Sequence, residues 1–169
     1  MAEPIARIRA HHAEILKELK KIPQAVVAVK PEAVDASREA LGGIVSFLQD
    51  ELKPHAEGEE QFLYPAVDDL VKQYKRATAT TSMDHVTITE EIETFKARTE
   101  KLLGLTASKA DLEEIRVAIA ELLEVAHHLD AVISLHLDKE EDILLPLAEQ
   151  HLSEAEAQEV LDQMHGGHH

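Results

Sequence analysis

The chain has 169 residues, of which 44% are hydrophobic but only 3% aromatic, and it contains neither tryptophan nor cysteine. This length suits one domain of ordinary size, and the shortage of aromatic residues favours packed helices over a β-sandwich. The lack of cysteine excludes disulfides, iron–sulfur clusters and thiolate metal sites, and a formal net charge of −16 argues against nucleic acid or anionic membranes as partners.

Apolar residues at alternating intervals of three and four mark helices in the first half of the chain. The stripe over residues 5–22 predicts a first helix that ends at Pro23, and residues 29–35 form a connector into a second helix. The second stripe, over residues 41–66, stays in phase across Pro54. Because a helix break would rarely preserve this register, we predict a kink at Pro54 and not a break.

The second half of the chain repeats this layout. Residues 75–81 join the two halves, and a stripe over residues 85–102 predicts a third helix that Gly104 closes. Ser108 or Asp111 then opens a fourth helix, because both residue types are common caps at helix N-termini.

A short final helix follows the fourth one, whose stripe continues to Leu147. Ser153 with Glu156 three residues later makes a capping box, and the helix that it starts is predicted to pack across one end of the bundle. Residues 1–164 are therefore predicted to form a single all-α domain, an up-down four-helix bundle with a short extra C-terminal helix. Residues 165–169 are interpreted as a flexible His/Gly tail, either an expression remnant or a loose metal-binding segment.

Targeting and membrane segments are not expected. Residues 1–10 lack the apolar core of a signal peptide, and no run of residues approaches the roughly 20 apolar residues of a membrane span. We therefore expect a cytoplasmic protein, a monomer or weak homo-oligomer, whose partners are small molecules and neither nucleic acid nor membrane.

One pattern occurs twice, at residues 55–65 and 136–146: His-x-x-x-Glu-Glu-x-φ-Leu-φ-Pro, where φ is apolar or aromatic. Residues four apart lie above one another on a helix, so each copy aims an imidazole and a carboxylate at the same point. The two copies predict a molecule whose halves carry the same chemistry.

Each of the four predicted long helices carries one histidine on its apolar stripe, and two of them also carry a glutamate. These candidate metal ligands are His12, His55, Glu59, His85, His136 and Glu140. Two buried glutamates would each cost several kcal/mol without a cation, which weighs against a bundle of merely hydrogen-bonded histidines. The set suits two ions about 3.5 to 4 Å apart better than one ion. Imidazole and carboxylate ligands favour iron, with manganese or zinc less favoured.

These residues resemble the H…HxxxE…H…HxxxE signature of haemerythrin-like, or HHE cation-binding, domains. The resemblance runs from His12 to Pro146. It implies an up-down four-helix bundle around a non-haem di-iron centre, bridged by Glu59, Glu140 and a solvent-derived oxo or hydroxo group. It also implies reaction with small oxidants such as dioxygen, peroxide or nitric oxide.

Two positions depart from the oxygen-carrying haemerythrins. Those carriers have a fifth histidine four residues after the third-helix histidine, where this chain has Thr89. The resemblance therefore implies an open or water-filled position on one metal, which favours redox turnover over reversible oxygen carriage. The carriers also place the last carboxylate five residues after its histidine, which would select Glu141, but helical phase and the match to Glu59 favour Glu140.

Other polar residues near the stripes are given weaker roles. Glu60 and His11 fall off their stripes and are interpreted as surface residues. His127 and His128 are also expected at the surface, although His128 could instead act beside the ligands. Tyr64 is interpreted as a packing aromatic at a helix end, with hydrogen bonding or radical trapping as the alternative.

The four histidines are expected to divide between two irons. His12 and His55 would hold mainly one ion, and His85 and His136 the other, with no catalytic residue beyond the metal centre. Apolar walls would protect a reactive species from side reactions. The expected wall residues are Leu48, Leu52, Ile88, Ile133, Phe62 and Ile143.

The function predicted on this basis is redox turnover of a small oxidant, such as a catalase-like decomposition of peroxide. A non-enzymatic sensor or storage module for dioxygen, nitric oxide or iron is the main alternative, and a structural zinc bundle is another. A ferritin-like oxidase is disfavoured, because only Glu124 and His127 show the Glu-x-x-His spacing of that class.

Overall fold

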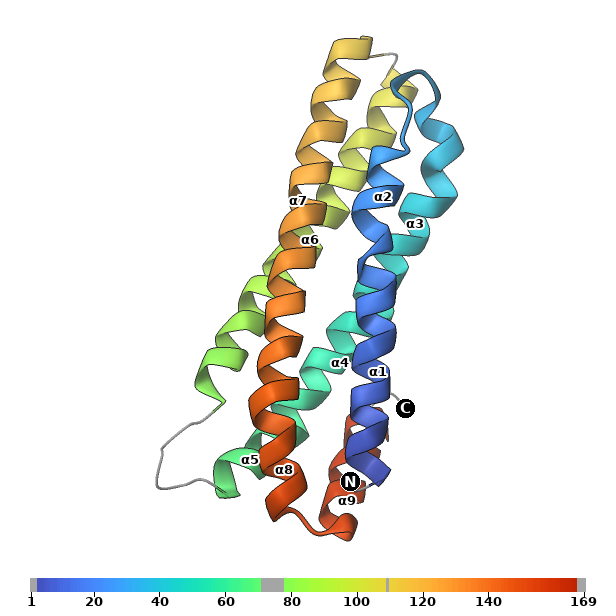
Figure 1. Ribbon diagram of the computed structural model, residues 1–169. Coiled ribbons are helices and arrows are strands. Elements are labelled where there is room, and N and C mark those ends of the chain that lie inside the picture. The colour runs from blue at the N-terminus through green and yellow to red at the C-terminus, as the bar shows by residue number, and fades with distance from the viewer. Residues whose placement is uncertain (1–2, 71–77, 109, 167–169) are drawn as a thin grey trace.

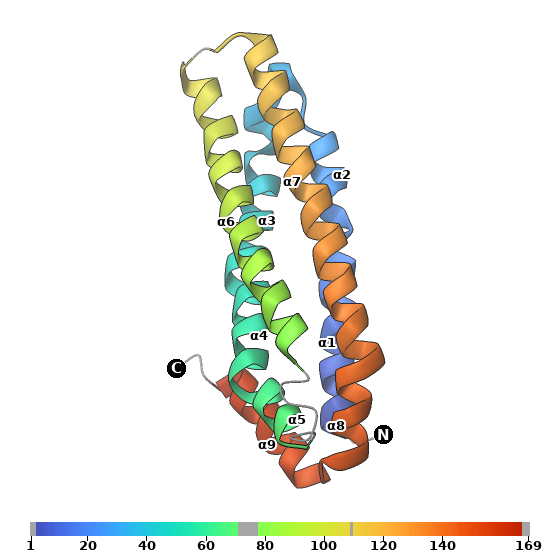
Figure 2. The ribbon, with the colours of Figure 1, turned by 90° about the vertical axis from the view of Figure 1, so that its left-hand side faces the viewer.

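The computed structural model describes residues 3–70, 78–108 and 110–166 (Figure 1). Every regular element in these ranges is helical, and they contain no strand. The long helices run side by side in an elongated bundle (Figure 2), which confirms the predicted all-α bundle. Within the same ranges, no helix is both long and apolar enough to cross a membrane.

The first long helix consists of α1 (Glu3–Leu19) and α2 (Lys21–Val27), with only Lys20 between them. The prediction that Pro23 ends this helix is wrong. Pro23 lies in the first turn of α2, where a backbone N–H has no partner within its own helix, so the missing hydrogen is tolerated. The chain then passes through the 3₁₀ helix η1 (Pro31–Ser37), which begins inside the predicted connector.

The second long helix alternates α-helical segments with wider π-helical turns. In chain order these are α3 (Arg38–Ser46), the π turn η2 (Phe47–Leu52), α4 (Lys53–Gly58), the π turn η3 (Glu59–Leu63) and α5 (Tyr64–Leu70). Pro54 lies at the start of α4, directly after η2, and the helix continues past it without a break, as predicted. Because Pro54 has no N–H to donate, an irregular turn beside it accommodates the missing hydrogen bond.

The third long helix, α6 (Ala79–Ser108), continues past Gly104. The prediction that Gly104 closes this helix is wrong. Leu105 packs against the hydrophobic core one residue later, so the chain buries more apolar surface by staying helical. Within the predicted connector, residues 75–77 lie outside the described part of the chain, and α6 begins in the remainder.

The fourth long helix comprises α7 (Leu112–Lys139), the π turn η5 (Glu140–Leu144) and α8 (Leu145–His151). Asp111 caps its start, because its side chain accepts a hydrogen bond of 2.8 Å from the backbone N–H of Glu114. Of the two caps considered from the sequence, Asp111 is therefore the one that opens the helix.

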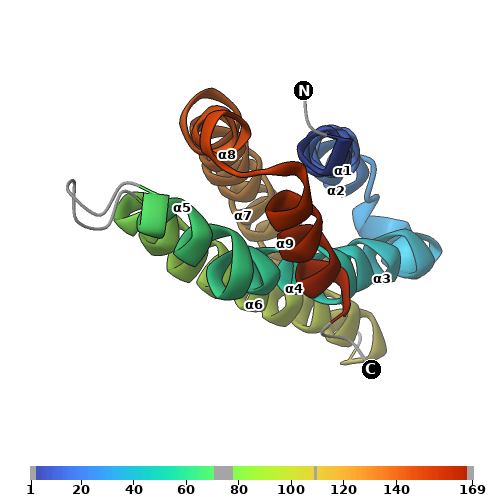
Figure 3. The same ribbon diagram turned by 90° about the horizontal axis from the view of Figure 1, so that it is seen from below.

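A final helix, α9 (Glu154–Gly166), lies across the end of the bundle, in contact with α1 and α4 (Figure 3). The Glu156 carboxylate accepts from the Ser153 N–H at 2.8 Å, and the Ser153 hydroxyl oxygen accepts from the Glu156 N–H at 3.3 Å. The predicted capping box and the placement of the terminal helix are both confirmed.

The docking of α9 depends on Gly58, which supplies no side chain at the contact. A Cβ at Gly58 would lie 3.1 Å from the carbonyl oxygen of Met164, whereas a Cβ at Gly43 would meet nothing within 4 Å. We expect Gly58→Val to lower the free energy of unfolding by about 1–3 kcal/mol by pushing α9 away, and Gly43→Val to change it far less. Urea unfolding of both variants checks this, and equal stability losses would contradict it.

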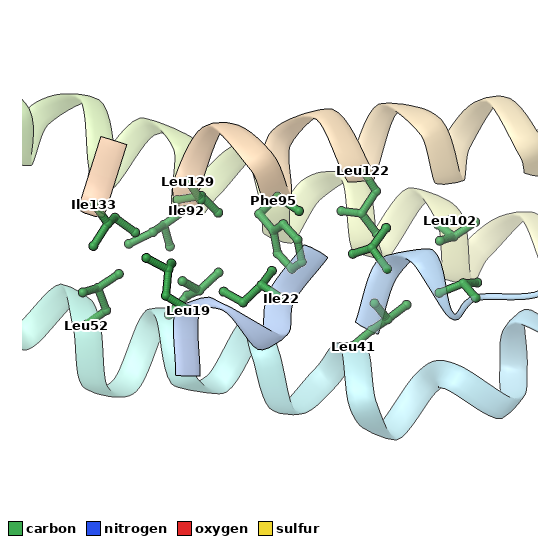
Figure 4. Close-up of a cluster of buried hydrophobic side chains, with 14 of the residues drawn as sticks. Leu19, Ile22, Leu41, Leu52, Ile92, Phe95, Leu102, Leu122, Leu129 and Ile133 are labelled. Atoms are coloured by element: carbon green, nitrogen blue, oxygen red, sulfur yellow. The ribbon is translucent and has the colours of Figure 1, made fainter. Parts of the chain in front are cut away.

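Two apolar clusters fill the bundle, one on each side of the inward histidines. The larger cluster includes Phe95 and Leu122 and draws on all four long helices (Figure 4). The smaller cluster forms where α9 covers the end of the bundle. His12 lies on α1 between Ile8 of the smaller cluster and Ile15 of the larger one, so the candidate ligands are enclosed by apolar side chains.

The inward stripe slips by one residue after each motif glutamate, contrary to the unbroken phase expected from the sequence. Phe62 and Ile143 were the expected inward residues, but Leu63 and Leu144 are the buried ones, and Ile143 is 56% exposed. The cause is the π turns η3 and η5, since each inserts one extra residue into the helical repeat. Ile143 is therefore not a wall residue.

Candidate metal centre

Six buried side chains from all four long helices converge between the two apolar clusters. His12 comes from α1, His55 from α4, Glu59 from η3, His85 from α6, His136 from α7 and Glu140 from η5. They form two overlapping groups, Glu59 with His85, His136 and Glu140, and Glu59 with His12 and His55, in which the potential ligand atoms lie within 4.8 Å of one another. The structure thus brings together all six residues that the sequence selects.

Glu59 is the common member of both groups. Its Oε1 lies 3.0 Å from His55 Nε2 and 3.1 Å from His12 Nε2, and its Oε2 lies 3.4 Å from His85 Nε2. The spacing of His55 and Glu59 by four residues places both on one helical face, as the motif predicts. One carboxylate therefore faces imidazoles from three different helices.

Glu140 occupies the corresponding position in the second motif. Its Oε2 lies 3.6 Å from Nε2 of both His136 and His12, and His136 Nε2 lies 3.0 Å from His85 Nε2. Glu140 is fully buried, whereas the neighbouring Glu141 points outward with a side chain that is 27% exposed. The structure places Glu140, and not Glu141, among the converging groups.

The outward Nδ1 atoms of three of these histidines face carboxylates. Nδ1 of His12 lies 2.8 Å from Glu141, and Nδ1 of His85 lies 3.0 Å from Glu60. Nδ1 of His136 lies 3.5 Å from the carboxylate of Asp84, the residue before His85 on α6. Glu60 is partly exposed and belongs to neither donor group, in agreement with its interpretation as a surface residue and not a ligand, but its contact with His85 was not predicted.

Tyr64 also belongs to the site. Its hydroxyl donates a 2.5 Å hydrogen bond to Glu140, and its ring stacks on that of His85 with centroids 5.4 Å apart. Tyr64 is buried, so its interpretation as merely a packing aromatic is wrong and the hydrogen-bonding alternative holds. The equivalent position in the second motif is Leu145, which has no hydroxyl, so nothing in the repeat marks Tyr64 as polar and functional.

The remaining histidines near the stripes differ in their surroundings. The ring of His11 meets that of His55 edge-on with centroids 4.5 Å apart, so His11 is half-buried beside a candidate ligand and not a plain surface residue. His127 and His128 are exposed on α7, and Nδ1 of His128 lies 2.8 Å from Glu91. Their interpretation as surface residues is confirmed.

The two central carboxylic acids have opposite protonation preferences in the metal-free site. Burial alone would raise the pKa of Glu59, but contacts with His55 and the other imidazoles hold that pKa well below its ordinary value. Burial raises the pKa of Glu140 well above its ordinary value, and the nearby negative charge of Glu59 raises it further. Ionisation is therefore favoured at Glu59 and disfavoured at Glu140.

The histidines divide in a similar way. Burial lowers the pKa of His136 to about 4, so its imidazole is neutral at neutral pH. Burial also opposes the charged forms of His12 and His85, but the carboxylates of Glu59 and of Glu141 or Glu60 outweigh it and raise the pKa of both histidines.

The buried polar atoms of this cluster fit a metal cation. His55 Nε2, Glu59 Oε2 and Glu140 Oε2 are buried without a partner in hydrogen-bonding geometry, although Glu59 Oε1 is close enough to His55 for an ion pair. Unsatisfied buried polar atoms are costly, and cations bound within the two donor groups would satisfy them. Nitrogen and carboxylate oxygen are ligands that first-row transition metals accept.

Metal binding is expected to release protons, because ligand atoms must be deprotonated. In the metal-free protein, the raised pKa values of His12, His85 and Glu140 favour their protonated forms. Affinity for Zn²⁺ should therefore increase as the pH rises from about 6 to about 8. Calorimetric titration in two buffers of different ionisation enthalpy measures the released protons; a pH-independent affinity without proton release would contradict this.

Comparison with known proteins places these features in a family. No curated protein and no solved structure matches this chain. The hemerythrin HHE cation binding domain family matches residues 3–121. That span includes the first copy of the repeated motif and ends before the second copy at residues 136–146, which the structure brings to the same site. The chain therefore belongs to the hemerythrin HHE cation binding domain family.

Proposed function

We propose that this protein holds a di-iron centre and turns over small oxidants, with peroxide decomposition as the leading reaction and dioxygen or nitric oxide as further ligands. The observation that carries the proposal is the pair of overlapping donor groups that share Glu59. One ion alone would leave part of this six-residue cluster unsatisfied, whereas two ions can share the carboxylates between them.

The donor groups support a division of the ligands between the two ions. His12 and His55 lie together on one side of Glu59, and His85 and His136 lie together on the other side with Glu140. The mixture of imidazole and carboxylate favours iron, with manganese or zinc less favoured. Iron bound there would supply one-electron redox chemistry toward small oxidants.

The side chains around the cluster keep bulk water out. Four of the six expected wall residues are buried in the larger apolar cluster, namely Leu48, Leu52, Ile88 and Ile133. Phe62 is half-buried and packs with the smaller cluster on the other side. Apolar surroundings limit side reactions of a reactive oxidant, which is a requirement for turnover without self-damage.

Two residues support turnover over reversible carriage. Thr89 lies one helical turn after His85, and its hydroxyl donates to the His85 carbonyl at 2.8 Å, so it adds no imidazole to the site. Tyr64 presents a hydroxyl hydrogen to Glu140, and burial together with the charges of Glu59 and Glu140 raises the pKa of Tyr64. This hydroxyl therefore keeps its proton and can act as a hydrogen-bond donor beside Glu140.

Elemental analysis and peroxide kinetics on one preparation test the proposal. Residues 167–169 should be removed first, so that terminal histidines do not add metal to the count. About two irons per chain with sustained peroxide loss proportional to iron content would support the enzyme. Two irons with only stoichiometric adduct formation would favour a sensor or storage module. One zinc per chain, or no iron after iron supplementation, would overturn the di-iron proposal.

A further inference from the structure

We infer that Glu60 and Glu141, the second glutamates of the two motifs, are positioning residues that each orient a histidine of the opposite half of the molecule. This inference rests on the proposed metal centre. Glu60, on η3 in the first half, contacts Nδ1 of His85 on α6 at 3.0 Å. Glu141, on η5 in the second half, contacts Nδ1 of His12 on α1 at 2.8 Å. In both contacts, the second glutamate of one half reaches the first inward histidine of the other half.

Helix geometry explains why the motif contains two adjacent glutamates. Consecutive residues on a helix point about 100° apart, so two neighbouring side chains cannot face the same point. Glu59 and Glu140 face the centre of the bundle, and the residue after each of them faces the adjacent helix. The first glutamate of each pair is thus available as a ligand. The second glutamate is available to contact the outward Nδ1 of a histidine on the adjacent helix.

A carboxylate on Nδ1 determines what Nε2 can do. Because an ionised carboxylate only accepts hydrogen bonds, Nδ1 of His85 and of His12 must carry the proton in these contacts. When a bound cation replaces the proton on Nε2, the lone pair of each neutral ring is on that atom, which lies 3.4 Å from Glu59 in His85 and 3.1 Å from Glu59 in His12. Outer carboxylates of this kind fix the tautomer and ring orientation and increase the basicity of the ligand nitrogen.

The two outer carboxylates are not equally suited to a test. Glu141 also forms an ion pair with Arg9 of α1, so its removal would loosen a helix contact as well as the histidine. Glu60 accepts a 3.0 Å hydrogen bond from the Ser82 hydroxyl and lines a surface pocket of about 580 Å³ together with Glu57. Glu57 is exposed on α4 in the same pocket, and it is a matched control for the loss of one negative charge.

The first test compares Zn²⁺ affinity of Glu60→Ala, Glu60→Gln and Glu57→Ala by competition with a chelator. Glu60→Ala should weaken binding at one of the two ion positions by about 10- to 100-fold, as loss of an outer-shell partner does elsewhere. Glu60→Gln should recover part of this loss, because the amide oxygen can still accept from Nδ1. Glu57→Ala should bind like the parent protein. An affinity of Glu60→Ala equal to that of Glu57→Ala would overturn the inference.

The second test establishes which histidine each glutamate orients. Imidazole nitrogen signals in NMR spectra distinguish the Nδ1–H tautomer from the Nε2–H tautomer. Glu60→Ala should change the signals of His85 and leave those of His12 unchanged, and Glu141→Gln should do the reverse. Changes confined to the histidine of the same motif, His55 or His136, would refute the crossed arrangement.

Both spectra should be recorded with and without Zn²⁺. A parent protein that binds neither Zn²⁺ nor iron would refute the proposed metal centre, while the metal-free spectra would still judge the crossed contacts. If the parent protein binds metal but Glu60→Ala leaves the His85 signals unchanged, the crossed contacts alone are refuted. Circular dichroism of each variant shows whether the helices are retained.

Discussion

Glu59→Gln is expected to remove high-affinity metal binding from both positions and reduce the bound iron from about two ions per chain to fewer than one. Glu59 belongs to both donor groups and touches imidazoles from three helices. Glutamine keeps the size of the side chain, so the packing survives, but it removes the negative charge that two bound cations would share. Elemental analysis after gel filtration measures the result.

His85→Ala provides the contrast, because His85 belongs to only one of the two donor groups. We expect this variant to lose one ion and to keep the other, which His12 and His55 would hold. Glu57→Gln, at an exposed position two residues before Glu59, should keep both ions and is the control for charge. If Glu59→Gln retained as much metal as Glu57→Gln, Glu59 could not be a shared ligand.

Phe95→Ala is expected to lower the free energy of unfolding by about 3–5 kcal/mol, the usual cost of emptying a large aromatic site in a core. Phe95 is 0% exposed, and Figure 4 shows its ring in the interior between the helices of the larger cluster. A loss of this size is a large share of the stability of a typical domain. Urea unfolding monitored by circular dichroism, with the slope compared between variants, measures it.

Phe47→Ala is the matched control for this core substitution. Phe47 is only partly buried and packs on the edge of the same cluster, so the cavity that its removal leaves is open to water and its loss should cost much less. Phe95 lies almost three helical turns from His85 on α6, so Phe95→Ala should keep its metal stoichiometry while folded. Equal destabilisation by the two variants would show that Phe95 is not central to the core.

The long helices and their inward faces were predictable because burial repeats with the helical period over many turns. The ends of those helices were less predictable. Pro23 and Gly104 carry strong local signals for a helix end, but tertiary packing of the following residues overrides both signals. Ser153 was predicted correctly and Asp111 was one of two predicted caps, because a cap is a local interaction between side chain and backbone that depends little on the rest of the fold.

The six converging side chains were predictable for the same reason, since polar residues on an otherwise apolar stripe are conspicuous. Their outer partners were not, because Glu60 and Glu141 reach histidines from the other half of the chain, and sequence spacing says nothing about such contacts. The exposure of Ile143 was missed because the π turn η5 starts at Glu140. A single extra residue in the helical repeat leaves no mark in composition or spacing.

Tyr64 makes the centre directional. The repeated motif alone would give two equivalent faces related by an approximate two-fold rotation, and an approaching molecule would have no reason to prefer one. The hydroxyl of Tyr64 stands beside Glu140, while Leu145 at the matching position offers only a hydrocarbon side chain. A molecule with chemically different ends, such as nitric oxide or a hydroperoxide, would meet the hydroxyl donor of Tyr64 on one side of the centre. On the other side, the matching residue Leu145 offers no hydrogen-bond donor. The difference between Tyr64 and Leu145 thus makes the two sides of the centre chemically different.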